Sequence, residues 1–265
     1  MSDRPGPERT LDVVAKRREV LAAVADGAAH VRDLRDELDV SRSTAYEATR
    51  ELERAGVLTR GDGSFELTPF GRSAVAAHDR SLAALDTLCA VRPELDGLRR
   101  DVSLPPVLCR GAEVVRAEPH APDRPFEAIG DFFDCATRMR GFAPVTGERY
   151  IAGLDEALAG DAFSIEMLTE ECVVEYLLSN HRDALDRWVD SDDVRLYQTG
   201  ETLPYGLLIE EEPAPSVGVM LYDESGQLRA FLATEDRAAV GRARERFEAR
   251  RATATELVGD APVDG

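Results

Sequence analysis

The stretch VSRSTAYEATRELERAGVLTRGDGSFELT, residues 40–68, decides the fold of the first part of the chain. Ser41 stands where a helix is expected to begin, because its hydroxyl can accept hydrogen bonds from the first free amides of that helix. Apolar residues from Ala45 to Ala55 recur at helical spacing. Two short runs of strand-forming residues then flank Gly61-Asp62-Gly63, which is typical of a tight hairpin turn. The stretch therefore predicts a helix followed by a β-hairpin.

Two more helices are expected before this stretch. Residues 11–25 place leucines and valines on one helical face, and residues 31–40 repeat the pattern. The order helix, helix, helix and hairpin predicts a winged helix-turn-helix DNA-binding domain over residues 11–68, preceded by a disordered N-terminus at residues 1–10. An apolar stripe then predicts a long helix within residues 69–100. This helix either simply packs onto the first helix or serves as a dimerisation or linker helix.

The helix that begins near Ser41 is the expected recognition helix. In a helix-turn-helix, the second helix of the pair lies in the major groove and its N-terminal residues contact base edges. Arginine can bind guanine through two parallel hydrogen bonds, and hydroxyl groups at a helix N-terminus favour a phosphate. The alternative is a solvated helical face on a module that binds other proteins. The predicted contacts to double-stranded DNA are Ser41, Arg42, Ser43, Thr44, Tyr46, Glu47, Arg50 and Arg60.

The chain is strongly acidic, and the charge is uneven. It has 51 Asp and Glu against 32 Lys and Arg, a formal net charge of -19, and Lys16 is its single lysine. Residues 1–100 contain 16 basic and 18 acidic side chains, whereas residues 101–265 contain 16 and 33. Dispersed carboxylates with almost no lysine are typical of a halophilic cell, where the Debye length falls to about 3 Å at 1 M salt. The acidic second part therefore does not exclude a DNA partner for the first.

Membrane and metal partners are not expected. No apolar stretch approaches the length of a membrane span, and the polar start MSDRPGPERT is neither a signal nor a transit peptide, so the sequence predicts a cytoplasmic protein. The cysteines at positions 89, 109, 135 and 172 form no CxxC pair and have no histidine at metal-ligand spacing. They are expected to be reduced and mostly buried thiols. We expect no metal site and no cofactor.

The second part of the chain predicts an α/β domain. Strand-like and helical runs alternate after the prolines and glycine of residues 93–106, and the last three strands follow one another closely. This pattern predicts an α/β effector or assembly domain over residues 101–250, with a partly antiparallel sheet and a disordered tail at residues 251–265. The sequence contains no GxGxxG, GxxxxGK[ST], HExxH or GxSxG motif, so no enzyme activity and no catalytic residue are predicted.

One small-molecule site is predicted in this domain. Arg138, Arg140, Thr146 and Tyr150 surround the end of a predicted strand and the loop and helix that follow it. Arginine at a strand end before a loop and helix suits a pocket for an anionic small molecule. The alternative is that these four residues are ordinary surface and core positions.

Four stretches carry a resemblance to a known family. The chain resembles the archaeal winged-helix transcriptional regulators whose C-terminal domain is of the methanogenesis-regulator type, many of them from haloarchaea. The stretches are LDVSRSTAYEATRELERAGVLTRGDGSFELTPFG (39–71), MRGFAPVTGERYIAGLDEAL (139–158), VRLYQTGETLPYGLLIEE (194–211) and VGVMLYDESGQLRAFLATED (217–236).

The resemblance implies a sequence-specific transcriptional regulator. It also implies a second domain that senses a small molecule or mediates assembly, in an α/β sandwich similar to the phospholipase D fold. The HxKxxxxD signature of that enzyme is absent, because Lys16 is the single lysine, so hydrolase activity is not expected. The sequence thus predicts a dimeric DNA-binding regulator. The alternatives are an α/β enzyme that acts on a phosphorylated small molecule and carries an accessory winged helix, and a winged-helix adaptor that binds proteins.

Overall fold

The computed structural model describes residues 5–61, 64–96, 98, 103–160 and 163–258. The chain divides into two compact units, Met1–Leu85 and Asp86–Gly265. The predicted hairpin tip at Asp62 and Gly63 lies outside the described residues, as do parts of the two predicted disordered ends and of the predicted domain boundary.

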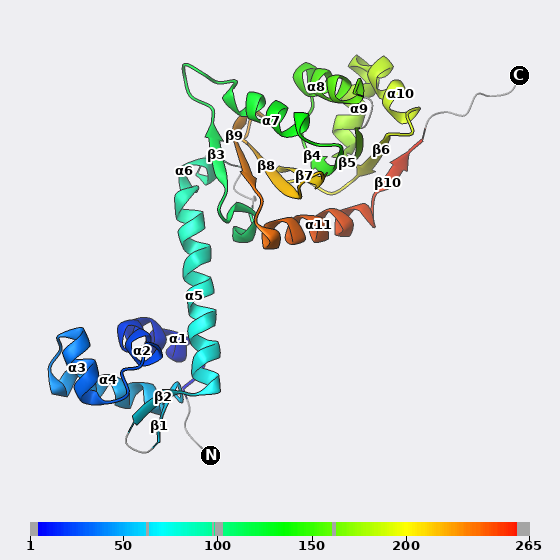
Figure 1. Cartoon of the computed structure of the whole chain (residues 1–265). Helices are drawn as coiled ribbons and strands as arrows, with labels where there is room; N and C mark the ends of the chain where they lie inside the picture. Colours follow the sequence, from blue (N-terminus) through cyan, green and yellow to red (C-terminus); the bar gives the residue numbers. More distant parts are fainter. Residues whose placement is uncertain (1–4, 62–63, 97, 99–102, 161–162, 259–265) are drawn as a thin grey trace, which may run out of the picture. The chain divides into compact units, whose positions relative to one another are not determined.

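The first unit is helical and contains one hairpin (Figure 1). As the sequence predicts, helices precede a hairpin and a further helix follows it, but among the described residues four helices precede the hairpin where three were expected. The hairpin strands are antiparallel, and Arg60 pairs with Phe65. The elements are α1 (Pro7–Lys16), α2 (Arg18–Ala25), α3 (Val31–Leu38), α4 (Arg42–Arg54), β1 (Leu58–Gly61), β2 (Ser64–Leu67) and α5 (Pro69–Ala90). Its core contains Val14, Leu21, Leu34, Leu52, Val57 and Phe65.

The beginning of the chain differs from the prediction. Residues 7–10, assigned to a disordered N-terminus, form the first turn of α1, because Pro7 suits the opening turn of a helix and Thr10 is buried and donates its hydroxyl to the Gly6 carbonyl at 3.0 Å. The single helix expected over residues 11–25 is interrupted at Arg17, whose φ and ψ of -110° and 22° leave the helical region. The guanidinium of Arg17 is held by the carboxylate of Glu51 on α4.

A close contact joins the hairpin to α5. A Cβ atom on Gly71 would lie 2.0 Å from the carbonyl oxygen of Val57, so only glycine fits there. The Thr68 hydroxyl donates to the Gly56 carbonyl at 2.7 Å and accepts from the Gly71 amide at 2.8 Å. The end of α4, the hairpin and the start of α5 are therefore fixed together.

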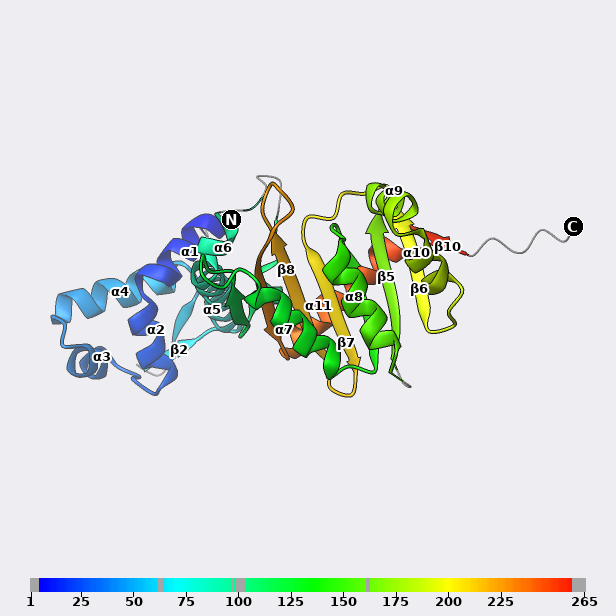
Figure 2. The same ribbon diagram turned by 90° about the horizontal axis from the view of Figure 1, so that it is seen from above.

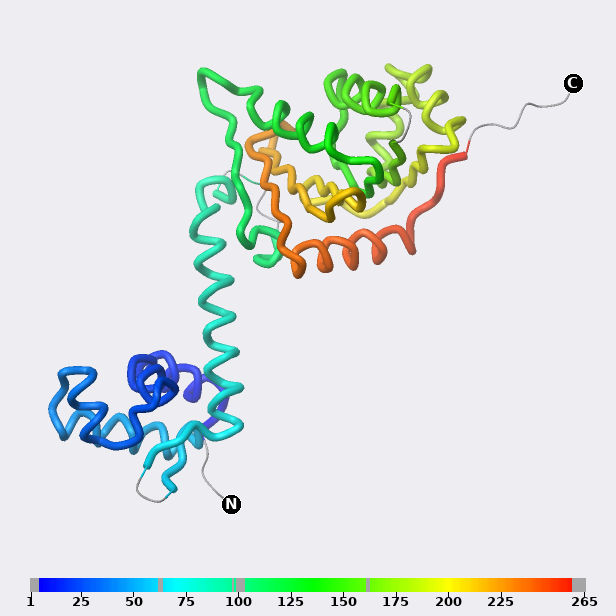
Figure 3. Tube along the Cα trace, in the orientation of Figure 1, coloured from blue at the N-terminus to red at the C-terminus, as the bar shows by residue number. Residues whose placement is uncertain are grey.

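The second unit is built on an eight-stranded mixed sheet with the order β10-β6-β5-β4-β7-β8-β9-β3. The pairs β4–β5 and β5–β6 are parallel, and the other pairs are antiparallel. The trace in Figure 3 passes from β7 through β8 to β9 before it enters the last helix. The strands are β3 (Glu113–Arg116), β4 (Arg138–Ala143), β5 (Ser164–Glu170), β6 (Val194–Thr199), β7 (Gly206–Glu212), β8 (Ser216–Tyr222), β9 (Leu228–Thr234) and β10 (Thr255–Leu257). The prediction of a mixed α/β fold with a large, partly antiparallel sheet is confirmed.

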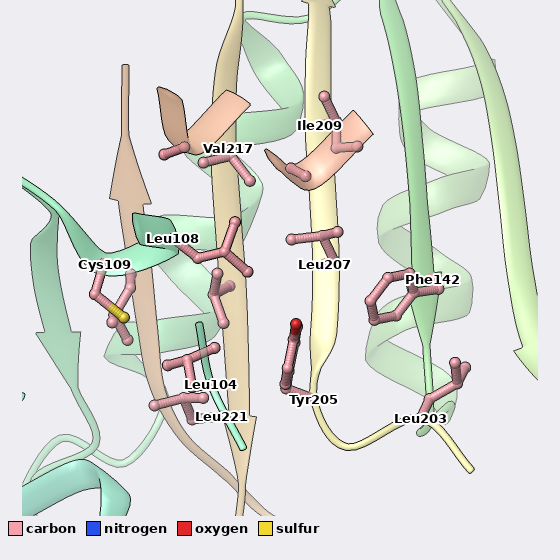
Figure 4. Close-up of a cluster of buried hydrophobic side chains, with 14 of the residues drawn as sticks. Leu104, Leu108, Cys109, Phe142, Leu203, Tyr205, Leu207, Ile209, Val217 and Leu221 are labelled. Atoms are coloured by element: carbon pink, nitrogen blue, oxygen red, sulfur yellow. The ribbon is translucent and has the colours of Figure 1, made fainter. Parts of the chain in front are cut away.

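Helices cover both faces of this sheet. Figures 1 and 2 show α7 (Arg124–Asp134), α8 (Glu148–Leu158), α9 (Glu171–Asn180) and α10 (Arg182–Val189) on one face, and α11 (Arg237–Arg251) on the other. Each face has its own apolar core. Figure 4 shows part of the core on the α11 face, where Phe142, Tyr205, Leu207 and Leu221 lie together. The short elements α6 (Arg92–Leu95) and η1 (Pro106–Cys109) complete the unit.

Two expectations about the second unit are wrong. The tail predicted as disordered over residues 251–265 contains β10, which pairs antiparallel with β6, because β6 would otherwise leave its backbone groups unpaired at the sheet edge. The cysteines are not mostly buried: Cys109 is buried, whereas Cys89, Cys135 and Cys172 are exposed. Residue type alone does not decide which face of its element a cysteine occupies.

Candidate functional site

A cluster of hydroxyl groups opens α4. The Oγ atom of Ser41 accepts a hydrogen bond from the Thr44 amide at 3.1 Å and lies 2.8 Å from both Ser43 Oγ and Thr44 Oγ1. Ser41 is therefore the N-cap of the helix, with a φ of -65° and a ψ of 155°. The preceding turn passes through Asp39, whose φ of 50° is left-handed. The cluster is exposed, so its hydroxyls and the positive end of the helix dipole face solvent.

The exposed face of α4 carries the other predicted contacts. Ala45, Ala48, Thr49 and Leu52 face the core, which leaves the opposite face to solvent. The guanidinium of Arg50 lies 5.8 Å from the ring centroid of Tyr46, and Tyr46 is 48% exposed. The residues on this face are Arg42, Ser43, Tyr46, Glu47 and Arg50.

The two arginines on this face have no carboxylate partner among the residues that the structure describes. Within the described ranges, no ion pair includes Arg42 or Arg50. Both guanidinium groups can therefore meet an external acceptor without first breaking an internal ion pair. Elsewhere in the unit, Lys16 and Arg17 bind Glu51, Arg18 binds Asp79, and Arg32 and Arg35 bind Asp36.

Arg60 lies on a separate element, the first strand of the hairpin. Its guanidinium is 4.7 Å from the ring centroid of Phe65, the residue opposite it in the ladder. Phe65 is buried, so its ring gives the exposed arginine a fixed base. All eight predicted DNA contacts are exposed: seven lie at the start or on the outer face of α4, and Arg60 is on β1.

The four residues predicted to bind an anion do not form one pocket. Arg138 and Arg140 lie on β4, whereas Thr146 and Tyr150 follow the other end of this six-residue strand, about 20 Å away from its start. Arg140 is also already paired, with Glu166 at 3.1 Å and Glu248 at 3.0 Å. The sequence places the four residues close together in the chain, but an extended strand separates the two pairs. The prediction of a single anion pocket is therefore wrong.

Thr146 and Tyr150 instead line an apolar cavity of about 100 Å³ between the sheet and the helices α7 to α10. The same two residues, with Val145, also line a larger open hollow at the surface, so they form the wall between cavity and solvent. Apolar residues from both layers complete the cavity, among them Ile129, Phe133, Ile165, Met167, Val174, Leu177, Trp188 and Met220.

Two tyrosines form a polar group beside the cavity. The Tyr150 hydroxyl donates to the Tyr222 hydroxyl at 3.1 Å, and Tyr222 donates to the Met220 sulfur at 3.3 Å. Burial raises the pKa of Tyr150 to about 12, so this hydroxyl remains a neutral donor at physiological pH. Sequence reasoning missed the cavity, because its walls come from strands and helices far apart in the chain and carry no motif.

Two further features concern metals and membranes. Across the part of the chain that the structure describes, no three His, Cys, Asp or Glu side chains come together in a way that could hold a metal ion. None of the described helices combines the length and the apolar character needed to cross a bilayer.

Matches to known families make the chain transcription-regulator-like. Residues 122–253, which include most of the sheet and α11, match the family described as "Methanogenesis regulatory protein FilR1, middle domain". Residues 8–88, which include the hairpin and most of α5, match the family described as the HVO_A0261 N-terminal domain. No curated protein is significantly similar to the chain.

Solved structures with a similar arrangement are distant in sequence. TrmBL2, described as an archaeal chromatin protein with a novel mode of DNA binding, is 13% identical, with a TM-score of 0.43 over 95% of this chain and 100% of that one. Nuc from Salmonella typhimurium, a phospholipase D family member, is 11% identical, with a TM-score of 0.41 over 56% of this chain and 98% of that one. NucT from Helicobacter pylori is 10% identical, with a TM-score of 0.41 over 55% of this chain and 98% of that one.

Proposed function

We propose that this protein is a cytoplasmic, dimeric transcription regulator of a halophilic archaeon that binds double-stranded DNA through a winged helix-turn-helix. The observation that carries the proposal is the outer face of α4, where a serine-capped helix start and two unpaired arginines are exposed beside a hairpin that presents Arg60. The match to a regulator family over residues 122–253 supports the same function. We propose no enzymatic activity.

In this proposal α4 is the recognition helix. Its N-terminal hydroxyls and free amides bind a backbone phosphate, which fixes the position of the helix in the major groove. Arg42 or Arg50 then binds guanine, and Glu47 accepts from the amino group of cytosine. Arg60 reaches the phosphate backbone or the minor groove beside the hairpin. Because molar salt removes most of the gain from counterion release, base contacts supply most of the affinity.

A second copy of the chain is the proposed partner of α5. Leu82 and Leu85 on this helix are 40% and 57% exposed. They continue, at a spacing of three and four residues, an apolar stripe whose earlier members, Val75 and His78, are covered within the chain. Such spacing is typical of helices that pair along an apolar seam. A dimer places two copies of α4 on one DNA duplex, so the operator is expected to be a palindrome.

The proposed effector of the second unit is a small, uncharged and largely apolar molecule. The cavity beside Thr146 and Tyr150 has a volume of about 100 Å³ and an almost entirely apolar lining, which suits a molecule of about the size of benzene. The threonine and tyrosine hydroxyls give such a molecule one polar contact on the side nearest solvent. Binding shifts the population between two arrangements of the dimer that differ in the spacing of their recognition helices, and operator affinity changes with it.

Genome-wide occupancy of the tagged protein in its host, at native intracellular salt, tests the DNA-binding function. We expect discrete promoter peaks with a shared palindrome for the native protein, and loss of these peaks for Arg42→Ala/Arg50→Ala. A flat profile for the native protein would contradict the regulator and favour an adaptor that binds other proteins.

The effector is tested separately by thermal unfolding in the presence of toluene. We expect toluene to raise the Tm of the native protein but not of Ala143→Leu, which fills the cavity. Equal responses of the two proteins would exclude binding in this cavity and would leave the DNA-binding proposal intact.

A further inference from the structure

Two half-buried arginines of the second unit lack an acidic partner among the described residues of a strongly acidic chain. Arg246 and Arg250 lie one turn apart on α11, and both are half-buried. Over the ranges that the structure describes, neither guanidinium has a carboxylate within ion-pair distance. Three other arginines of the same helix are paired: Arg242 with Glu245, Arg244 with Glu211, and Arg251 with Glu248.

The two guanidinium groups lie side by side over neighbouring aromatic rings. Arg246 is 5.8 Å from the ring centroid of Tyr205, and Arg250 is 5.0 Å from that of Phe142. The centroids of these two rings are 5.7 Å apart, and Figure 4 shows both side chains on the same face of the sheet. Burial, together with the like charge of Arg246, lowers the pKa of Arg250. The pair is therefore held together at an electrostatic cost.

Three buried polar atoms in this place have no hydrogen-bond partner. They are the Tyr205 hydroxyl and the Nε atoms of Arg246 and Arg250, for which the described residues provide no partner. Tyr205 is fully buried, with an exposed fraction of 0%. Buried polar groups are nearly always satisfied, and a cluster of unsatisfied ones points to an ion or molecule that completes the site. The two Nε groups can only donate, and the phenol hydroxyl has a proton to donate as well as an oxygen that accepts, so an acceptor group satisfies all three.

The location also suits a ligand. Phe142 lies near the carboxyl end of β4, and Tyr205 lies in the loop between β6 and β7, beyond the carboxyl end of β6. In open α/β sheets, ligands bind beyond the carboxyl ends of the parallel strands. The charge of Glu201 acts on Arg250 from beyond ion-pair distance, and one carboxylate cannot neutralise two guanidinium groups.

We propose that Arg246, Arg250 and the Tyr205 hydroxyl form a binding site for a small oxyanion, the carboxylate or phosphate group of a metabolite. Two adjacent guanidinium groups and a phenol hydroxyl match the several acceptor atoms of such a group, and the buried position strengthens each charge-assisted hydrogen bond. The site lies on the α11 face of the sheet and is separate from the apolar cavity on the opposite face. It is independent of the proposed DNA-binding function.

The test is an anion titration of the full-length protein at constant ionic strength. Inorganic phosphate, sulfate or acetate replaces chloride in steps, and the Tm is recorded for each mixture. Because phosphate and sulfate also stabilise proteins without binding a specific site, each variant is compared with a charge-matched control. The control is Arg237→Gln, which removes an exposed arginine at the other end of α11.

We expect a saturable rise in Tm for the native protein and for Arg237→Gln with at least one of these oxyanions. Arg246→Gln and Arg250→Gln should each shift half-saturation to at least tenfold higher anion concentration. Tyr205→Phe keeps the ring and its packing but removes one donor, so it should fold as well as the native protein and bind the anion more weakly. Its intact fold keeps the test valid even if an arginine variant unfolds.

A second measurement uses the phosphorus resonance of inorganic phosphate. The native protein should broaden this resonance, and Arg246→Gln and Tyr205→Phe should reduce the broadening. Identical Tm curves and line widths for all variants would overturn the proposal. Chloride alone saturating the site, with no further response to an oxyanion, would also overturn it.

Discussion

Replacing Arg50 by alanine should separate DNA recognition from folding. The Arg50 guanidinium lies 5.8 Å from the ring centroid of Tyr46 on the exposed side of α4, and the described part of the chain offers it no carboxylate. Folding therefore loses only an exposed cation–π contact, worth about 0.5–1 kcal/mol. On DNA, the same change removes a two-point contact to guanine worth about 1–3 kcal/mol, which lowers affinity roughly 5- to 150-fold.

The assay pairs fluorescence anisotropy on a labelled operator, at native salt, with thermal unfolding of each variant. Arg9→Ala is the control, because Arg9 is an exposed arginine on α1 and its loss changes the net charge equally. Arg17→Ala should lower stability and not operator affinity, which is the reverse of the effect expected for Arg50→Ala. The Arg17 side chain is 15% exposed and its Nη2 lies 2.8 Å from Glu51, so this change should cost about 1 kcal/mol of stability and leave operator affinity unchanged.

The specificity of the loss identifies the kind of contact. Removing a base contact weakens binding to the operator but hardly changes binding to unrelated DNA. Removing a phosphate contact weakens binding to both. If Arg50→Ala and Arg9→Ala weakened binding to operator and unrelated DNA by the same factor, only charge would matter. The assignment of α4 as the recognition helix would then be refuted.

Three further predictions concern the fold and its surface. Gly71→Ala should destabilise the first unit by about 2–3 kcal/mol in denaturant unfolding, because the new Cβ would lie 2.0 Å from the Val57 oxygen. Gly153→Ala, in α8, meets no atom within 4 Å and should cost nothing. Leu85→Glu should give a folded monomer in light scattering, since that side chain is 57% exposed within the single chain, and its Tm should no longer depend on protein concentration. A dimer of unchanged mass would exclude α5 as the seam. Burial raises the pKa of Cys109 to about 12, so a thiol reagent at neutral pH should modify three cysteines quickly and Cys109 only on unfolding. Rapid modification of all four would contradict its burial.

Much of the first unit is determined by the sequence alone. The apolar spacing within α4, the hydroxyl at Ser41 and the glycines at positions 61 and 63 are local signals in the sequence, and the structure contains the helix and the paired strands that they predict. The outward position of Arg42 and Arg50 follows from the same spacing, because the buried stripe of a helix decides which residues face solvent. Whether that face contacts DNA remains a prediction.

Long-range pairing decided what the sequence left open. The strand β10 joins the sheet because the edge of β6 accepts it, although nothing in residues 251–265 predicts a partner so far away in the chain. Arg138 and Arg140 are close to Thr146 and Tyr150 in sequence, yet the first pair lies on β4 and the second beyond its end, so the two pairs line different hollows.

The opposite case is found on the α11 face of the same sheet. Arg246 and Arg250 are far from Tyr205 and Phe142 in the chain, and only the packing of α11 onto the sheet brings them together. Hydrophobic spacing and helix caps act within a few residues, so the sequence by itself determined the elements and their outer faces. Strand order and the packing of helices onto a sheet depend on contacts between distant segments, so the tertiary structure decided which side chains share a site.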